Sequence, residues 1–232
     1  MRVLVTRPRD DAEGTAAKLA ARGHQAVFAP LLDVRFRAGT AITLDDVQAV
    51  LVTSANGIRA LAARTKRRDV KVISVGAQSA EAARALGFSD VGHASRDVFA
   101  LAELAAANLA PQNGALFHAA GSETRGNIAE ILSARGFSIR SEILYDAIAS
   151  TTLSPDAQAA LANATLDAAL FFSPRTARIF ADIVAKEELA DSCRAFDACC
   201  ISDAVARELH TLSFREVRVA SEPNQDALLQ LL

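Results

Sequence analysis

Small and hydroxyl-bearing residues recur in this sequence directly after short apolar runs. These turns read Thr6-Arg7-Pro8, Thr53-Ser54-Ala55-Asn56, Gly76-Ala77-Gln78-Ser79, Gly121-Ser122-Glu123-Thr124, Ser173-Pro174-Arg175-Thr176 and Ser202-Asp203-Ala204. Small side chains let backbone N–H groups approach an anion closely, and hydroxyls add further donors. The turns therefore predict sites that bind anionic groups such as carboxylates.

Helix capping is the competing interpretation of these turns. Ser, Thr, Asn and Asp are the usual residues that begin helices, and each stabilises its helix by about 1 kcal/mol without any ligand. For a single turn, capping is the simpler explanation. Binding gains weight only if two lobes present facing rows of such turns across one cleft.

Two kinds of side chain could add more specific chemistry. Arg7, Arg125 and Arg175 follow predicted strands, and their planar guanidinium groups match carboxylates, although each could instead be solvated at a helix start. Tyr145 is the only tyrosine and lies in an extended stretch. Its phenol could donate a hydrogen bond to a ligand, or it could be a half-buried strand aromatic bonded to a backbone carbonyl. Both interpretations of Tyr145 stay open.

The common catalytic motifs do not occur in the sequence. It has neither a glycine-rich phosphate loop with its lysine nor G-x-G-x-x-G after the first strand, so phosphoryl transfer and dinucleotide binding lack support. No G-x-S-x-G elbow indicates acyl transfer. The four histidines have no metal-ligand spacing, and each is expected at the surface or at a strand end. Cys193, Cys199 and Cys200 lack C-x-x-C spacing and are expected as buried apolar residues. We expect no cofactor and no metal.

The elements that must position these residues follow the rhythm of an α/β fold. Short apolar runs alternate with alanine-rich amphipathic segments, which is typical of a parallel sheet with crossover helices. The predicted strands are 3–6, 26–29, 49–52, 70–75, 115–118, 139–147, 168–172, 198–201 and 216–219.

An internal repeat indicates two similar lobes. Residues near 3–31 resemble those near 115–145, and the segments that begin at Ala49 and Val72 resemble those that begin at Ala168 and Cys199. The chain could be cut into contiguous halves. Alternatively, extended stretches at about 30–37 and 142–150 could be linker strands, with lobe 2 (38–147) inserted into a discontinuous lobe 1 (1–35 and 150–232). These patterns leave both cuts open.

Composition excludes several classes of protein. The 25 basic and 27 acidic residues give a net charge of -2, which argues against a nucleic-acid partner. With 51% hydrophobic residues the chain can form a packed core. No apolar run approaches the roughly 20 residues that span a bilayer, and the apolar run at residues 3–6 is too short for us to expect a signal peptide there. We expect a cytoplasmic monomer with no membrane partner.

Taken in order, these motifs resemble those of the uroporphyrinogen-III synthase family over nearly the whole chain. The resemblance rests on Val3-Leu4-Val5-Thr6-Arg7-Pro8, Val52-Thr53-Ser54-Ala55-Asn56-Gly57, Val75-Gly76, Gly121 with Arg125, Leu144-Tyr145, Phe171-Phe172-Ser173-Pro174 and Ser221-Glu222-Pro223-Asn224. It implies two flavodoxin-like lobes, each a parallel sheet flanked by helices, joined by a two-stranded linker. It also implies the discontinuous cut.

The resemblance further implies a reaction without a cofactor. Hydroxymethylbilane, a linear tetrapyrrole with acetate and propionate on every ring, would be closed to uroporphyrinogen III with inversion of ring D and loss of water. The electron-rich substrate supplies much of the reactivity. The protein's contribution would therefore be mainly to position the substrate in the cleft between the lobes.

The resemblance also assigns site residues. Tyr145 would assist departure of the substrate hydroxyl, Thr53, Ser54, Ser79 and Ser173 would be hydroxyl positions along the cleft, and Arg125 a basic position. With the turn residues described above, the expected substrate-binding residues are Arg7, Thr53, Ser54, Asn56, Ser79, Gly121, Ser122, Arg125, Ser173, Pro174 and Ser202. The chain departs from the family at Ser202-Asp203-Ala204-Val205, where a glycine and paired threonines are usual, and at Asn56, where some relatives have arginine. A carboxylate at Asp203 would repel the substrate unless it points away or caps the helix.

Two other classes of protein fit parts of the sequence. A two-lobed binding or sensor protein would share the lobes and the polar cleft without any catalysis, but the sequence shows neither an export signal nor a DNA-binding segment. A hydrolase or transferase could assemble its site only in three dimensions, although the usual nucleophile and phosphate motifs are missing.

Overall fold

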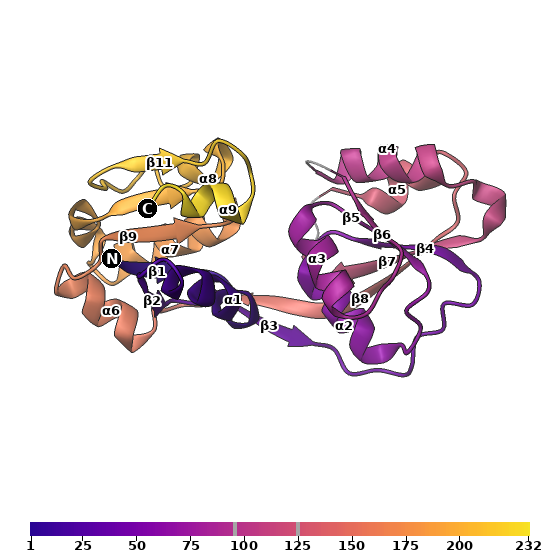
Figure 1. Cartoon of the computed structure of the whole chain (residues 1–232), viewed down its shortest axis with the longest axis horizontal. Coiled ribbons are helices and arrows are strands. Elements are labelled where there is room, and N and C mark those ends of the chain that lie inside the picture. The colour runs from indigo at the N-terminus through magenta and orange to yellow at the C-terminus, as the bar shows by residue number, and fades with distance from the viewer. Residues whose placement is uncertain (95–96, 124–125) are drawn as a thin grey trace. The chain divides into compact units, whose positions relative to one another are not determined.

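The computed structural model describes residues 1–94, 97–123 and 126–232 and divides into two compact units (Figure 1). Unit 1 comprises Met1–Asp33 and Ile148–Leu232, and unit 2 comprises Val34–Ala147. Each unit has a sheet of mainly parallel strands with helices on both faces. This arrangement confirms the predicted α/β class.

The sheet of unit 1 has the strand order β2-β1-β9-β10-β11, and each pair of neighbours is parallel. Its strands are β1 (Arg2–Val5), β2 (Gln25–Phe28), β9 (Ala168–Phe171), β10 (Asp197–Cys200) and β11 (Val217–Val219). Its helices are α1 (Arg9–Ala20), α6 (Pro155–Ala162), α7 (Pro174–Lys186), α8 (Asp203–Arg207) and α9 (Gln225–Leu229), with a 3-10 helix at Ala190–Ala195.

Alternation along β1 explains how both faces of this sheet are covered. Leu4 packs with α6, α7 and α8 on one face, whereas Val3 and Val5 pack with α1 and α9 on the other. All three side chains are fully buried, as expected for a central parallel strand. Cys199 and Cys200 are also buried on opposite faces, and burial raises the pKa of their thiols to about 11 and about 12. The prediction that they serve as apolar core residues is confirmed.

The sheet of unit 2 has the order β3-β8-β7-β4-β5-β6. Its strands are β3 (Leu32–Phe36), β4 (Val47–Val52), β5 (Lys71–Ser74), β6 (Val91–His93), β7 (Ala115–Gly121) and β8 (Ile139–Ala149). Its helices are α2 (Ala55–Arg64), α3 (Ala77–Ala85), α4 (Val98–Asn108) and α5 (Ile128–Ser133), with a 3-10 helix at Pro111–Asn113. Residues of α2 and α3 pack on one face, and residues of α4 and α5 pack on the other.

The two sheets have the same strand order when strands matched by the sequence repeat are compared. If β7, β8, β4, β5 and β6 are matched to β1, β2, β9, β10 and β11, both sheets read in the same order. This is the flavodoxin-like order, with the first strand second from one edge. The chain enters the two sheets at different strands, so the second sheet is a circular permutation of the first.

The strands β3 and β8 are hydrogen-bonded neighbours that cross the boundaries between the units. They correspond to the two extended stretches in the sequence. Arg37 forms a two-point ion pair with Asp146. The Nε atom of Arg37 lies 2.8 Å from one carboxylate oxygen of Asp146, and its Nη2 atom lies 2.7 Å from the other. The pair ties the end of β3 to β8.

One histidine differs from its predicted place at the surface or at a strand end. His118 lies in the middle of β7, is only 5% exposed, and its Nε2 atom has no hydrogen-bond partner. Burial lowers the pKa of its imidazole. The sequence does not reveal this because an isolated histidine in an apolar run has no distinctive spacing.

Among the residues described, none of the helices is both long enough and apolar enough to span a membrane.

Candidate functional site

The strand order predicts where each sheet can bind a ligand. In unit 1 the chain leaves β1 toward β2 and later returns to β9 on the other side of β1. In unit 2 it leaves β4 toward β5 and β6 and later places β7 on the other side of β4. Parallel sheets bind ligands at the carboxyl ends of the strands beside such a reversal. The turns after β1 and β9, and those after β4 and β7, are therefore the candidate sites.

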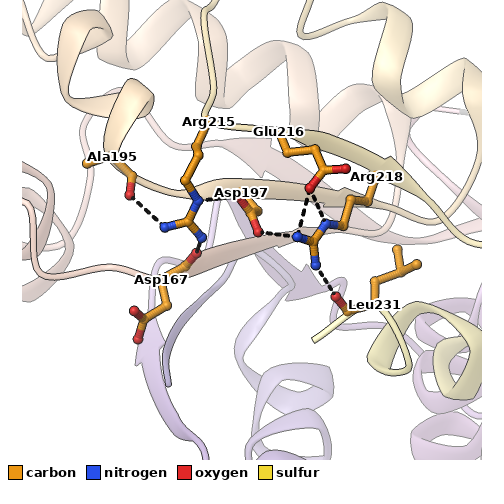
Figure 2. Close-up of polar contacts among 7 residues, drawn as sticks. All are labelled: Asp167, Ala195, Asp197, Arg215, Glu216, Arg218 and Leu231. Carbon is orange, nitrogen blue, oxygen red and sulfur yellow. Dashed lines mark hydrogen bonds and ion pairs between the residues drawn. The ribbon is translucent and has the colours of Figure 1, made fainter.

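At the opposite end of the unit 1 sheet, where the strands begin, charged side chains pair with one another (Figure 2). Asp197 begins β10, and its buried carboxylate lies 2.6 Å from Nε of Arg215 and 3.0 Å from Nη2 of Arg218. The hydrogen bond from Arg215 lowers the pKa of Asp197, and the charge of Arg218 adds to this effect. Arg215 also donates to the carbonyls of Ala195 and Asp167. This end of the sheet is held together by its own side chains, whereas the candidate turns lie at the opposite, carboxyl end of the strands.

In unit 2, Ser54 and Tyr145 meet at the carboxyl-end edge. Their hydroxyl oxygens lie 2.7 Å apart and share a hydrogen bond. Ser54 also begins α2, because its side chain accepts a hydrogen bond from the backbone N–H of Gly57 at 3.3 Å. Tyr145 is only 7% exposed and belongs to the core cluster that contains α2. Capping and contact with Tyr145 therefore coexist at Ser54.

Gly121 makes room for the ring of Tyr145. A Cβ atom at this position would lie 2.5 Å from Cζ and 2.7 Å from Oη of Tyr145, which is closer than real side chains approach. A glycine is thus required by the neighbouring ring, not by a left-handed backbone. The end of β7 is shaped to accept the phenol.

Other predicted residues of unit 2 lie in the turns or first helical turns after its strands. Thr53 and Asn56 flank Ser54 and are half-buried, and Asn56 accepts a hydrogen bond from Arg59 at 3.1 Å. Ser79 is buried in the first turn of α3, after the strand next to β4. Ser122 is exposed, and its N–H donates to the carbonyl of Tyr145 at 2.9 Å.

Asp146, the residue after Tyr145, carries a negative charge that is paired with Arg37. Hydrogen bonds from Arg37 lower the pKa of Asp146, with a smaller effect in the same direction from the Ser122 hydroxyl. Sequence reasoning missed both Arg37 and Asp146. The only available signal was opposite charge on the two extended stretches.

In unit 1, the turn after β1 holds Arg7 in an internal network. The side chain is 5% exposed, and its Nη1 atom donates to Gln225 at 2.7 Å and to Thr15 at 3.3 Å. Its Nη2 atom lies 3.3 Å from a carboxylate oxygen of Asp11, and its guanidinium covers the Phe172 ring. Sequence reasoning missed Gln225 and Phe172 because they lie far from Arg7 along the chain. A role for Arg7 as a carboxylate ligand stays a prediction.

The turns after β9 and β10 begin helices. Ser173 caps α7 by accepting from the N–H of Thr176 at 3.2 Å, and Pro174 occupies the first helical position. Ser202 begins α8 without a hydrogen bond from its side chain to the helix, and Asp203 is exposed at the first position. Because Ser202 occupies the N-cap position and Asp203 is already the first helical residue, the carboxylate of Asp203 is not the cap of this helix.

The structure thus brings several predicted residues together within each unit. In unit 2, Tyr145, Ser54 and Gly121 are in contact, and Ser122 is bonded to the backbone of Tyr145. In unit 1, Arg7 contacts the residue that precedes Ser173. The predicted residue Arg125 lies outside the described residues. Among residues 1–94, 97–123 and 126–232, no cluster of His, Cys, Asp and Glu could hold a metal ion.

Comparison with known proteins adds evidence for the family. The family model described as uroporphyrinogen-III synthase HemD matches residues 13–230. Among solved structures, uroporphyrinogen-III synthetase from Helicobacter pylori is similar with a TM-score of 0.62 and 14% identity, covering 100% of this chain and 98% of the other. A mutant uroporphyrinogen III synthase from Thermus thermophilus is similar with a TM-score of 0.53 and 16% identity, covering 99% and 96%. No curated protein sequence matches the chain.

Proposed function

The chain belongs to the uroporphyrinogen-III synthase family, and we propose that it cyclises hydroxymethylbilane to uroporphyrinogen III with inversion of ring D and loss of water. The observation that carries this proposal is the family match over residues 13–230. The two similar structures support the fold over nearly their whole length. The alternative of a two-lobed binding protein is not favoured.

The reaction needs little from a conventional catalytic group. The pyrrole nitrogen next to the hydroxymethyl group can push out the hydroxyl, which takes up one proton and leaves as water while the pyrrole N–H loses one proton, so that an azafulvene remains. Ring D then attacks through its substituted carbon to form a spiro intermediate. The bond from that carbon to the bridge carbon of ring C breaks, and the bridge carbon bonds to the other α-carbon of ring D, which loses its proton and closes the macrocycle with ring D inverted. The protein's part is to favour this attack over direct closure, and positioning can supply that preference.

We assign Tyr145 the role of assisting departure of the hydroxyl. A phenol can donate a hydrogen bond to the leaving oxygen, and Tyr145 is held at the carboxyl-end edge of its sheet by Ser54. This is the edge at which ligands of parallel sheets bind. The position supports the assignment independently of the family resemblance.

We further propose that the substrate's carboxylates contact the helix-start turns at the carboxyl ends of the strands. In unit 2 the candidate residues are Thr53, Asn56, Ser79 and Ser122, and in unit 1 they are Ser173, Pro174 and Ser202. Hydroxyls and N–H groups of such turns suit carboxylates. Ser79 is buried and Pro174 has no N–H, so these two are candidates by family resemblance only. Arg125 is a candidate from its place after a predicted strand and from the family resemblance. The internal network around Arg7 favours a structural role for that residue.

We expect the enzyme to act as a monomer in the cytoplasm and to need no cofactor. The net charge of -2 supports the absence of a nucleic-acid partner.

Product analysis tests the proposed function. Enzymatically generated hydroxymethylbilane is supplied to the purified chain, and the porphyrins are oxidised and separated into isomers. The expected product is the type III isomer. The type I isomer alone, which is the product of spontaneous closure, would overturn the proposal and leave the binding-protein interpretation ahead.

A further inference from the structure

Three features of unit 2 converge on the position of one phenol, that of Tyr145. They are an irregularity in the pairing of β7 with β8, the missing side chain at Gly121 and the hydroxyl of Ser54. Each feature acts on a different part of Tyr145: its backbone, its ring and its hydroxyl.

The irregular pairing determines the face on which Tyr145 lies. Up to Ala120 the two strands pair in step, with Ala120 opposite Ile143, but Gly121 lies opposite Tyr145 and Leu144 is the extra residue. Successive residues of a strand point to opposite faces. Without this bulge, Leu144 would lie opposite Gly121 and Tyr145 would point to the other face. Bulges of this kind redirect side chains next to active sites.

The bulge places Tyr145 on the face covered by α2. Along β7, Phe117 and Ala119 point to one face, and His118 and Ala120 point to the other. Phe117 and Ala119 belong to the core cluster that contains α2 residues. Gly121 continues this alternation, and Tyr145 pairs with it. The ring therefore lies over Gly121, and its hydroxyl reaches the first turn of α2 at Ser54.

We propose that Ser54 and Gly121 are positioning residues that act through Tyr145, in place of the substrate-binding roles expected for them. This inference rests on the proposed function for its kinetic consequence, since Tyr145 is the group that would assist the leaving hydroxyl. Ser54 holds the phenol oxygen, and Gly121 provides the space for the ring. Neither residue needs to touch the substrate.

The chain offers a direct probe of this arrangement. Tyr145 is the only tyrosine, and the sequence contains no tryptophan. Selective ¹³C-tyrosine labelling therefore yields signals from Tyr145 alone. The Cζ resonance responds to hydrogen bonding at the phenol oxygen, so it reports the contact with Ser54 in the absence of substrate.

The first experiment compares Ser54→Ala with Ser54→Thr by this probe. We expect Ser54→Ala to shift the Cζ resonance and Ser54→Thr to restore it, because threonine retains both the hydroxyl and the helix cap. Ser154→Ala is the matched control: Ser154 also caps a helix and also makes a second hydrogen bond, to the carbonyl of Phe28. An unchanged Cζ resonance in Ser54→Ala would overturn the inference.

The second experiment separates positioning from substrate binding by kinetics. We expect Ser54→Ala to lower kcat roughly 10- to 100-fold, as misplacement of a reacting group does, with little change in KM. In a Tyr145→Phe background, Ser54→Ala should have no further effect on kcat, because the group it positions is gone. A raised KM at unchanged kcat, or additive effects of the two changes, would show that Ser54 binds substrate directly.

Gly121→Ala provides an independent arm. Its Cβ must displace the ring, so we expect a shifted Cζ resonance and a lower kcat. Gly92→Ala in β6 is the control, since a Cβ there meets nothing within 4 Å. An unshifted resonance in folded Gly121→Ala would exclude the steric role. The NMR arms need no substrate, so they decide the positioning even if the unmodified chain yields only the type I isomer, which would refute the proposed function instead.

Discussion

The guanidinium carbon of Arg7 lies 4.3 Å from the centre of the Phe172 ring, where β1 and β9 end side by side. A cation over an aromatic face is attracted by the negative potential of that face. This contact joins the turn after β1 to the turn after β9, and the contacts of Arg7 with Asp11 and Gln225 join it to α1 and α9. The carboxyl-end edge of unit 1 is thus built around a buried charge.

Replacing that charge should lower stability more than substrate affinity. Arg7→Met keeps much of the side-chain volume but removes the positive charge beside the carboxylate of Asp11, whose side chain is 10% exposed. Loss of one partner of a buried ion pair costs about 3–5 kcal/mol. We expect the free energy of unfolding in urea to fall by about 3 kcal/mol, with KM little changed. Unaltered stability together with a much higher KM would instead identify Arg7 as a substrate ligand.

Single hydroxyls in the two units should have graded effects on activity. Thr53→Ala and Ser173→Ala each remove one of many proposed carboxylate contacts. A hydrogen bond contributes about 1 kcal/mol, which corresponds to roughly fivefold in kcat/KM. Ser173→Ala should also lower the free energy of unfolding by about 1 kcal/mol because Ser173 caps α7. Steady-state kinetics and urea unfolding measure both effects. Complete loss of activity in either variant would contradict a distributed binding surface.

Asp197 should make the stability of unit 1 depend on acid pH. Its pKa is lower in the folded protein than the usual value of 3.8, so it stabilises the fold above that value and loses this contribution as pH falls through the folded pKa. We expect Asp197→Asn to lower the free energy of unfolding by about 2 kcal/mol at pH 7, since bonds to charged groups contribute about 1.5–3 kcal/mol. The difference from the unmodified chain should shrink below pH 4. A constant difference from pH 7 to pH 3 would show that ionisation is irrelevant.

His118 should act in a different pH range. Burial lowers the pKa of His118, so the unfolded chain binds its proton first as pH falls below the usual histidine value of 6.5. Folding is then penalised by at most about 1.4 kcal/mol per pH unit. We expect His118→Leu to lack this penalty and therefore to gain stability relative to the unmodified chain between pH 6.5 and pH 5. If the free energies of unfolding of His118→Leu and of the unmodified chain changed in parallel over this range, the imidazole of His118 would not be the source of the pH dependence.

Two glycines should respond oppositely to the same substitution. A Cβ at Gly57 would lie 2.6 Å from the carbonyl oxygen of Ala119, so Gly57→Ala must push α2 away from β7 and lower the free energy of unfolding by about 1–3 kcal/mol. Gly14 is exposed within α1, and a Cβ there meets nothing within 4 Å. Gly14→Ala should raise stability by about 0.5–1 kcal/mol because alanine favours the helix. Thermal unfolding of both variants measures the contrast.

The core strands could be predicted from sequence because they are continuous apolar runs. The predicted segments 49–52, 168–172 and 198–201 correspond to β4, β9 and β10 with small differences at their ends. β6 was missed because Val91–His93 contains only three residues, one of them glycine. The repeat in the sequence correctly matched strands that hold equivalent places in the two sheets.

The contacts within the site could be predicted only in part. Local spacing identified Ser54 and Ser173 as helix-start residues, since a cap depends on the next three residues. The bond between Ser54 and Tyr145 joins residues 91 positions apart and depends on a bulge, which has no signature in a single sequence. The partners of Arg7 and the burial of His118 likewise follow from packing between distant segments.

The discontinuity of unit 1 has a consequence for its synthesis on the ribosome. Unit 2 is one continuous segment and can fold as soon as Ala147 has emerged, whereas β1 must wait for its neighbour β9 and for the later strand β10. Until β9 is made, β1 can pair with β2 on one side only, and its other side has unpaired backbone N–H and C=O groups. During synthesis, β1 is therefore the strand of unit 1 that waits longest for a partner on one of its sides.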